Sequence, residues 1–253
     1  MKKLFFILLA LVLHGCGTSK FVSNDKTLRV LPSFSFTPKS NASPGSLDMS
    51  IAIVQPVFVS KDAEFLVSPF PEMAITMGND FEEMLTSKGF TVKGPFASRD
   101  NMVYTEKKTT DFIIQIEIDL RIGSDCKAIY HANFNPLLIL LGGSSNSFYT
   151  MEGNITLGGN LIITALSPQY GEKIWKKQIS LSNITFNYVG NIKWTGEPTT
   201  AEQLMKDNRF YNSFVAMLEK FYITALDVVW SQIDPAEMKL ITKQAKEADG
   251  KNK

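Results

Sequence analysis

The stretch DFIIQIEIDLR, residues 111–121, decides the fold of this chain. Apolar and polar side chains alternate along it, as on a half-buried strand, because successive residues of a strand point to opposite faces of a sheet. One face carries Phe112, Ile114, Ile116, Ile118 and Leu120, and the other carries Ile113, Gln115, Glu117, Asp119 and Arg121. The pattern predicts a sheet with one dry face and one wet face.

The flanking sequence predicts further strands. Upstream, the apolar run Ile51–Val54 predicts a strand buried on both faces, and residues 90–92 predict a short strand. Downstream, residues 148–166 and 172–182 predict a pair of strands, joined by the turn sequence SPQYG at 167–171.

Two helices are predicted, at residues 69–87 and 200–232. The first has Met and Phe side chains at spacings of three and four, with Pro71 in its first turn and Gly89 just past its end. The second carries an apolar stripe at the same spacings, made of Tyr211, Phe214, Leu218, Phe221, Ala225 and Val229. The sequence therefore predicts an α+β fold, a single domain in which a mostly antiparallel sheet of about five strands is packed by two main helices.

The N-terminal residues have the features of an export signal. Two lysines precede the apolar run Leu4–Leu13, which is too short for a bilayer span of about 20 residues. Residues 13–16, LHGC, resemble the lipobox of bacterial lipoproteins, and this implies cleavage before Cys16 and acylation of Cys16, for example with palmitate. Gly17 follows Cys16. An Asp at this position would resemble an inner-membrane retention signal, so the glycine favours sorting to the outer membrane. The alternative is an uncleaved N-terminus with an incidental cysteine.

Composition predicts how the chain is divided. Residues 1–15 are the signal peptide, and residues 16–47, rich in Ser, Thr, Pro, Lys and Asn, are a flexible tether. Residues 48–233 form the α+β domain. Residues 234–253 are a polar C-terminal tail with a frayed end.

The charge balance argues against nucleic acid as a partner. Removal of residues 1–15 takes two lysines from the 26 Lys+Arg, and the remaining bases do not exceed the 25 Asp+Glu, whereas phosphate binding needs a clear basic excess. Only Cys16 and Cys126 are present, so with lipid on Cys16 no disulfide can form within the chain. We expect Cys126 to be a buried small hydrophobic residue, with an intermolecular bond or a reactive thiol as alternatives.

The residues do not form a recognisable catalytic or metal site. His131 is the one histidine left after removal of the signal, so a zinc site or a Ser-His-Asp triad would depend on it alone. Glu117 and Asp119 could act as acid and base, but a solvated strand face with an ion pair is the favoured interpretation. We therefore expect a protein that is not an enzyme and that holds no metal or cofactor.

A sugar-binding site is one hypothesis for residues 186–194, FNYVGNIKW. Sugar sites often combine flat rings with amide and charged donors, and this segment offers Tyr188, Asn191 and Trp194. The alternative is an edge strand whose rings simply pack. The apolar run at residues 136–141 is expected in the core, and otherwise as a surface for a partner or the bilayer.

The order of these elements resembles the neuraminyllactose-binding hemagglutinin (HpaA) family of Helicobacter lipoproteins. Besides the lipobox, the resemblance rests on residues 51–58, 85–92, 112–120, 151–153 and 166–172. It implies an outer-membrane lipoprotein of the cell envelope, on the cell surface or in the flagellar sheath, that acts as an adhesin for sialylated host glycans.

The sequence departs from this family at one important place. The family's proposed sialic-acid motif is a Lys/Arg-rich run after the strand that matches residues 112–120, and here only Arg121 and Lys127 offer a charge-assisted partner to a carboxylated sugar. The candidate ligand-binding residues are Arg121, Lys127, Tyr188, Asn191 and Trp194. The alternative function is a structural or assembly lipoprotein of the envelope or flagellar sheath, for which residues 136–141 and the long aromatic helix would suit protein partners.

Overall fold

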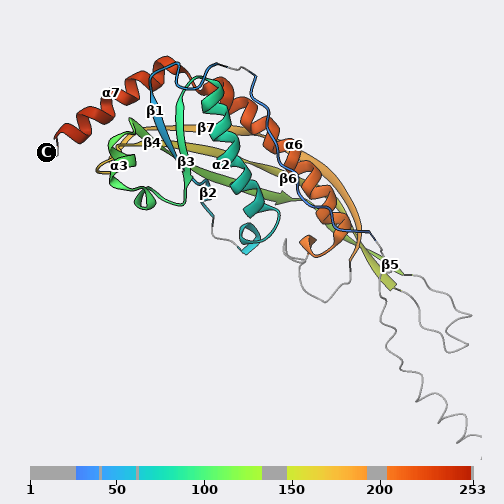
Figure 1. Ribbon diagram of the computed structural model, residues 1–253. Helices are drawn as coiled ribbons and strands as arrows, with labels where there is room; N and C mark the ends of the chain where they lie inside the picture. The colour runs from blue at the N-terminus through green and yellow to red at the C-terminus, as the bar shows by residue number, and fades with distance from the viewer. Residues whose placement is uncertain (1–26, 40–41, 61–62, 133–146, 193–203, 252–253) are drawn as a thin grey trace, which may run out of the picture.

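The structure, a computed structural model, describes residues 27–39, 42–60, 63–132, 147–192 and 204–251. In Figure 1 two long helices lie side by side across one face of a curved sheet. The strands are β1 (Ser50–Val54), β2 (Val57–Phe58), β3 (Thr91–Phe96), β4 (Phe112–Ser124), β5 (Lys127–Ala132), β6 (Ser147–Leu166) and β7 (Lys173–Ile192). The helices are α2 (Phe70–Ser87), α3 (Tyr104–Lys108), α6 (Asn208–Gln232) and α7 (Pro235–Lys251), with 3-10 turns η1 (Ala63–Leu66) and η2 (Arg99–Asn101).

The described strands form one mixed, seven-stranded sheet in the order β3-β1-β4-β6-β5, with β2 also on β4 and β7 also on β6. Strand β1 is parallel to both β3 and β4, whereas β6 is antiparallel to β4, β5 and β7. The prediction of a mostly antiparallel sheet of about five strands is therefore wrong, although the α+β class holds. The sheet is mixed because α2 lies between β1 and β3 in the chain. A helix that connects two neighbouring strands brings the chain back to the end of the sheet where the first strand began, so the second strand runs parallel to the first.

Strand β4 has the two-faced character that its sequence predicts. Its dry side chains face the helices and are at most 3% exposed. On the other face Ile113 packs with Ala52, Val54, Met102 and Leu166 in a small separate cluster. Beyond that cluster the face carries polar side chains, and we call this polar part of the sheet, from Gln115 on β4 to Asn187 on β7, the outer face.

The apolar stripe of α6 lies inside the core, as predicted. The ring of Phe214 is fully buried, and its centroid lies 5.8 Å from the Phe70 ring and 5.9 Å from the Phe210 ring. The helix begins at Asn208 rather than at residue 200, because Asp207 caps it by accepting hydrogen bonds from the backbone N–H groups of Arg209 and Phe210.

Residues 27–39, which the sequence assigned to a flexible tether, are packed along α6, and we call them the strap. Asn212 of α6 accepts a hydrogen bond from the Val30 N–H at 2.9 Å, and Glu219 accepts one from the Ser33 N–H at 2.7 Å. Two strap side chains, Phe34 and Phe36, are buried. The strap therefore belongs to the packed domain, and the prediction of a flexible tether does not hold for residues 27–39.

The predicted polar tail is also corrected, because its described residues form α7. Met238, Ile241 and Ala245 are at most 2% exposed. Lys246 forms an ion pair of 2.9 Å with Asp111 at the start of β4. The helix was missed because its apolar side chains are few and lie among many charged ones. Within the described residues, every helix is too short or too polar to be a candidate for crossing a membrane.

A buried polar pair joins α2, α6 and the strap. Tyr222 donates a 2.6 Å hydrogen bond to Asp80, and the Phe34 ring packs at 5.2 Å from the Tyr222 ring. Burial raises the pKa of Asp80, while the bonds from Tyr222 and from the Phe36 backbone act in the opposite direction. The carboxylate therefore depends on its donors to remain charged in the core.

The variant Tyr222→Phe is expected to lower the free energy of unfolding by about 1–3 kcal/mol, because it leaves a buried acceptor without its hydroxyl donor. Losing this donor raises the pKa of Asp80 further, so the deficit should be larger at pH 7 than at pH 4, where the carboxyl is closer to neutral. Urea unfolding at the two pH values measures this. The exposed Tyr104→Phe is the control, and equal deficits at both pH values would contradict the assignment.

Candidate functional site

Arg121 lies on the outer face and is exposed to solvent. Its guanidinium group is 3.6 Å from the Asp119 carboxylate, which also accepts a 3.1 Å hydrogen bond from Asn160 on β6. The Arg121 side chain is 79% exposed, so this ion pair is weak and solvated. The expected solvated strand face with an ion pair is confirmed here. Arg121 remains accessible to an anionic ligand.

Asp125 lies in the two-residue break between β4 and β5, which pair with β6 in one continuous register. Its carboxylate accepts hydrogen bonds from both the backbone and the side-chain N–H groups of Asn154 on β6. These bonds hold the pKa of Asp125 below its usual range. Cys126 is partly buried at this break rather than fully buried as expected, and its backbone N–H donates to the Ser124 hydroxyl. Strand β5 therefore continues the line of β4 along β6.

Arg121 and Lys127 lie on the same outer face but not side by side. Arg121 is opposite Gly158 of β6, whereas Lys127 is opposite Glu152. These two β6 positions are six residues apart, which corresponds to roughly 20 Å along a strand. A single sugar carboxylate therefore cannot pair with both cations at once.

Tyr188 points to the other side of the sheet. Its ring meets the Phe210 ring edge-on with centroids 5.0 Å apart, and it lies over Gly190, where any Cβ would overlap it. The side chain is 5% exposed, and burial raises its pKa to about 12. The ring is part of the core and is not presented to a ligand in solvent.

The structure describes only part of the remaining residues that the sequence predicts for the site. Asn191 pairs with Thr150 near the end of β7, and its side chain lies outside the described part. Cys16, Trp194 and the apolar run 136–141 also lie outside the described residues, as does the His131 side chain. In the residues described, no group of His, Cys, Asp and Glu side chains could hold a metal ion.

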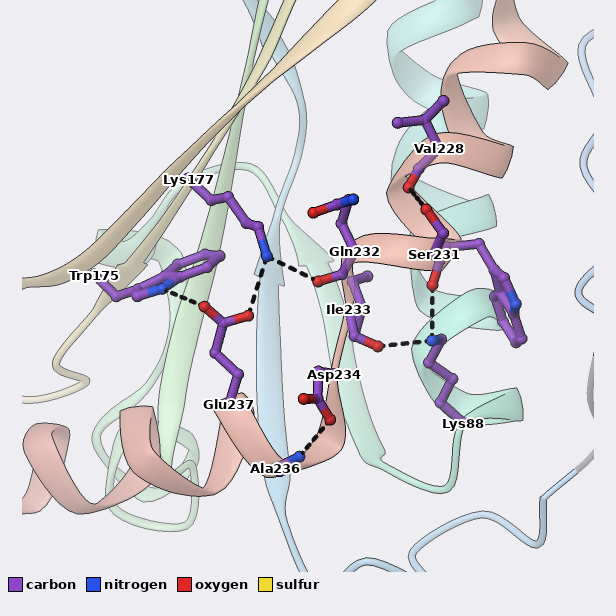
Figure 2. A network of polar contacts seen from close by, with 11 residues as sticks. Lys88, Trp175, Lys177, Val228, Ser231, Gln232, Ile233, Asp234, Ala236 and Glu237 are labelled. Carbon is purple, nitrogen blue, oxygen red and sulfur yellow. Dashed lines mark hydrogen bonds and ion pairs between the residues drawn. The ribbon is translucent and has the colours of Figure 1, made fainter.

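Sequence reasoning missed a polar network at the junction of α6 and α7 (Figure 2). Lys88, at the end of α2, donates to the carbonyl oxygens of Trp230 at 2.8 Å and Ile233 at 2.7 Å. Its ammonium group also lies over the Trp230 ring, 4.4 Å from the centroid. Burial lowers the pKa of Lys88, and the nearby Asp234 opposes this shift.

The second half of this junction comes from β7 and α7 (Figure 2). Lys177 donates to the Gln232 carbonyl at 3.0 Å and pairs with Glu237 at 3.1 Å. Trp175 donates its indole N–H to the same Glu237 at 3.0 Å. Cations suit the C-terminus of a helix, where carbonyl groups lack intrahelical partners. The two lysines therefore close the end of α6, and the network has a structural role.

Comparisons with known proteins bear on the fold. No protein-family model matches the chain, and no curated protein matches it. Among solved structures, one described as a "putative neuraminyllactose-binding hemagglutinin homolog" from Helicobacter pylori has a TM-score of 0.55 at 14% identity, covering 83% of this chain and 98% of that one.

Two further solved structures overlap less well. A lipoprotein from Neisseria meningitidis has a TM-score of 0.26 at 12% identity, covering 66% of this chain and 99% of that one. A Xanthomonas campestris protein has a TM-score of 0.33 at 15% identity, covering 86% of this chain and 97% of that one. Scores this low do not establish a shared fold. The comparisons therefore show that this chain has the fold of the hemagglutinin homolog from Helicobacter pylori.

Proposed function

We propose that this chain is an outer-membrane lipoprotein whose folded domain is a non-enzymatic binding module. The observation that carries the proposal is the N-terminal pattern, in which a charged start, a short apolar run and LHGC end at Cys16. The fold shared with the hemagglutinin homolog supports a binding role. The open outer face, which bears exposed cationic, amide and hydroxyl groups, offers a surface for a polar ligand.

The ligand class we propose is sialylated host glycans, bound at the end of the outer face. Lys127 is exposed there and can form a charge-assisted hydrogen bond with a carboxylate. Asn191 pairs with Thr150 of β6 near the end of β7, and Trp194 follows it in the sequence. Arg121 is a separate cation farther along the face, and Tyr188 is removed from the set because its ring is buried.

Binding of sialyllactose to the purified protein tests the ligand class. The variant Lys127→Ala is expected to weaken binding by about tenfold, which corresponds to the loss of one hydrogen bond to a charged group. Arg121→Ala should have a smaller effect, and Trp194→Ala one comparable to Lys127→Ala. Lys176→Ala is the matched control, since Lys176 is exposed on β7 near the opposite end of the sheet. Saturable binding that none of these variants changes would contradict the site.

The second candidate function is a structural or assembly role in the envelope or flagellar sheath through protein partners. One of its two supports is removed, because the aromatic stripe of α6 lies in the core and is not a free surface. Protease treatment of whole cells, with a periplasmic marker as control, separates the two functions. An adhesin is cleaved while the marker survives, whereas a domain protected until the outer membrane is opened favours the periplasmic structural role.

A further inference from the structure

The strap fixes the end of the domain from which the N-terminal residues leave. Asn208, the first residue of α6, donates a 2.9 Å hydrogen bond to the Thr27 carbonyl. Lys39, at the other end of the strap, pairs with Asp227 near the end of α6 at 2.8 Å. The strap thus runs parallel to α6, as Figure 1 shows, and its first residue lies at the start of that helix. We call this the strap end of the domain.

The docked strap leaves a short connection to Cys16. Eleven residue steps separate Cys16 from Thr27, and at ~3.5 Å per residue they reach at most ~39 Å. Without docking, the steps from Cys16 to Asp48 could reach ~110 Å. The 25-residue helix α6 is itself about 37 Å long. With lipid on Cys16, the strap end is therefore held nearest to the bilayer.

Several elements meet at the strap end. The end of β7 reaches it through the contact of Tyr188 with Phe210, in the first turn of α6. The segment that follows η1 reaches it through the 2.8 Å hydrogen bond between the hydroxyls of Ser68 and Tyr211. Arg29 of the strap lies over the Tyr211 ring, with its guanidinium carbon 3.5 Å from the ring centroid.

These elements expose large apolar side chains at the strap end. Leu28 and Leu31 of the strap are 86% and 89% exposed, and Leu66, the last residue of η1, is 69% exposed. Val67, which follows Leu66, is 47% exposed. Apolar side chains gathered at one end of a domain indicate a contact with a partner or a membrane, since isolated ones need no explanation but groups of them do.

We propose that the strap end lies against the phospholipid surface that carries the lipid on Cys16, with Leu28, Leu31, Leu66 and Val67 in the headgroup region. The proposal rests on the proposed lipoprotein function and adds the orientation of the domain. The occupant is a lipid surface because the short connection brings this end, and not the α7 end, to the bilayer. Partial insertion of a few apolar side chains gives weak binding that adds to that of the acyl chains.

The test places an environment-sensitive fluorophore at single cysteines in the full-length lipidated protein. The background is Cys126→Ser, and the labelled variants are Leu31→Cys and Val67→Cys at the strap end. The matched control is Leu240→Cys on α7, which is 64% exposed at the other end of the domain. The protein is reconstituted into phosphatidylethanolamine and phosphatidylglycerol vesicles, with and without spin-labelled lipid.

The expected result is a blue-shifted emission at positions 31 and 67, quenched by the spin-labelled lipid about twofold more than at position 240. Equal quenching at all three positions in vesicles that carry the protein would overturn the orientation while leaving the lipid anchor intact. Labels at 31 and 67 that the spin-labelled lipid does not quench, and whose emission shifts to the blue only when an envelope protein fraction is added, would overturn it in favour of a protein partner. Failure of the lipidated protein to float with the vesicles would remove the anchor, and the orientation with it.

Discussion

Replacing Phe214 with alanine is expected to lower the free energy of unfolding by about 3–5 kcal/mol. The side chain is fully buried in the second turn of α6, between the rings of Phe70 on α2 and Phe210 one turn earlier. Truncation removes the apolar contacts of a whole ring and leaves a cavity between two helices and the sheet. The surrounding side chains are close-packed and can fill this cavity only by shifting from their native positions.

Guanidinium chloride unfolding of the chain from residue 17 onward, which lacks the signal and the lipidation site, measures this loss. Ile223→Ala is the matched control on the same helix, because Ile223 is 48% exposed and its truncation should change the free energy by less than about 1 kcal/mol. Similar losses for the two variants would show that the aromatic cluster is not the central packing element of the domain.

Replacing Gly159 with alanine is expected to cost about 3 kcal/mol, although it adds only one methyl group. Gly159 has a φ of +150° on β6, where the β6–β7 register shifts, and an added Cβ would overlap the Asp119 carbonyl oxygen of β4. The obstacle is backbone in the middle of a sheet, so relief requires the strands to separate locally.

Two other glycines provide the comparison for Gly159. At Gly123 of β4 the nearest atom to an added Cβ is the Thr156 carbonyl oxygen at 3.9 Å, an ordinary contact, so Gly123→Ala should be tolerated. At Gly158 an added Cβ would meet the Asn183 side chain, which can rotate away, so Gly158→Ala should be intermediate. Thermal unfolding that ranked Gly159→Ala no lower than Gly123→Ala would contradict this account.

Local sequence patterns predicted the elements whose two faces differ most. The alternation along residues 112–120 predicted β4, and the stripe from Tyr211 to Val229 predicted the buried side of α6. Both signals are strong because one face contacts the core and the other contacts water. The first helix is also confirmed, within one residue of its predicted start.

The errors come from interactions between segments that are distant in the sequence. Strand β1 is apolar on both faces, which predicts burial but not the direction of its neighbours. Strand β7 runs to Ile192 rather than to residue 182, because the register shift near Gly159 changes which residues face the core and breaks the alternation. Helix α7 packs through a few side chains, so its stripe is too sparse to recognise.

The candidate site shows the same division between local pattern and three-dimensional arrangement. The exposure of Arg121 and Lys127 follows from their residue type and strand position, but only the pairing of β4 and β5 with β6 in one continuous register fixes how far apart they lie. Tyr188 was assigned to a ligand site because an aromatic residue in a polar segment suits either role. Only the packing of Phe210 and the absence of a side chain at Gly190 place its ring in the core.

The direction of the strap also determines how the domain bears mechanical force. A pull on the chain ahead of Thr27, directed away from the start of α6, acts along the strap and not across it. The bonds to Asn208, Asn212 and Glu219 are then loaded together, in shear, and share the tension before any of it reaches β1. A strap of the opposite direction would instead be peeled away one contact at a time under a much smaller force.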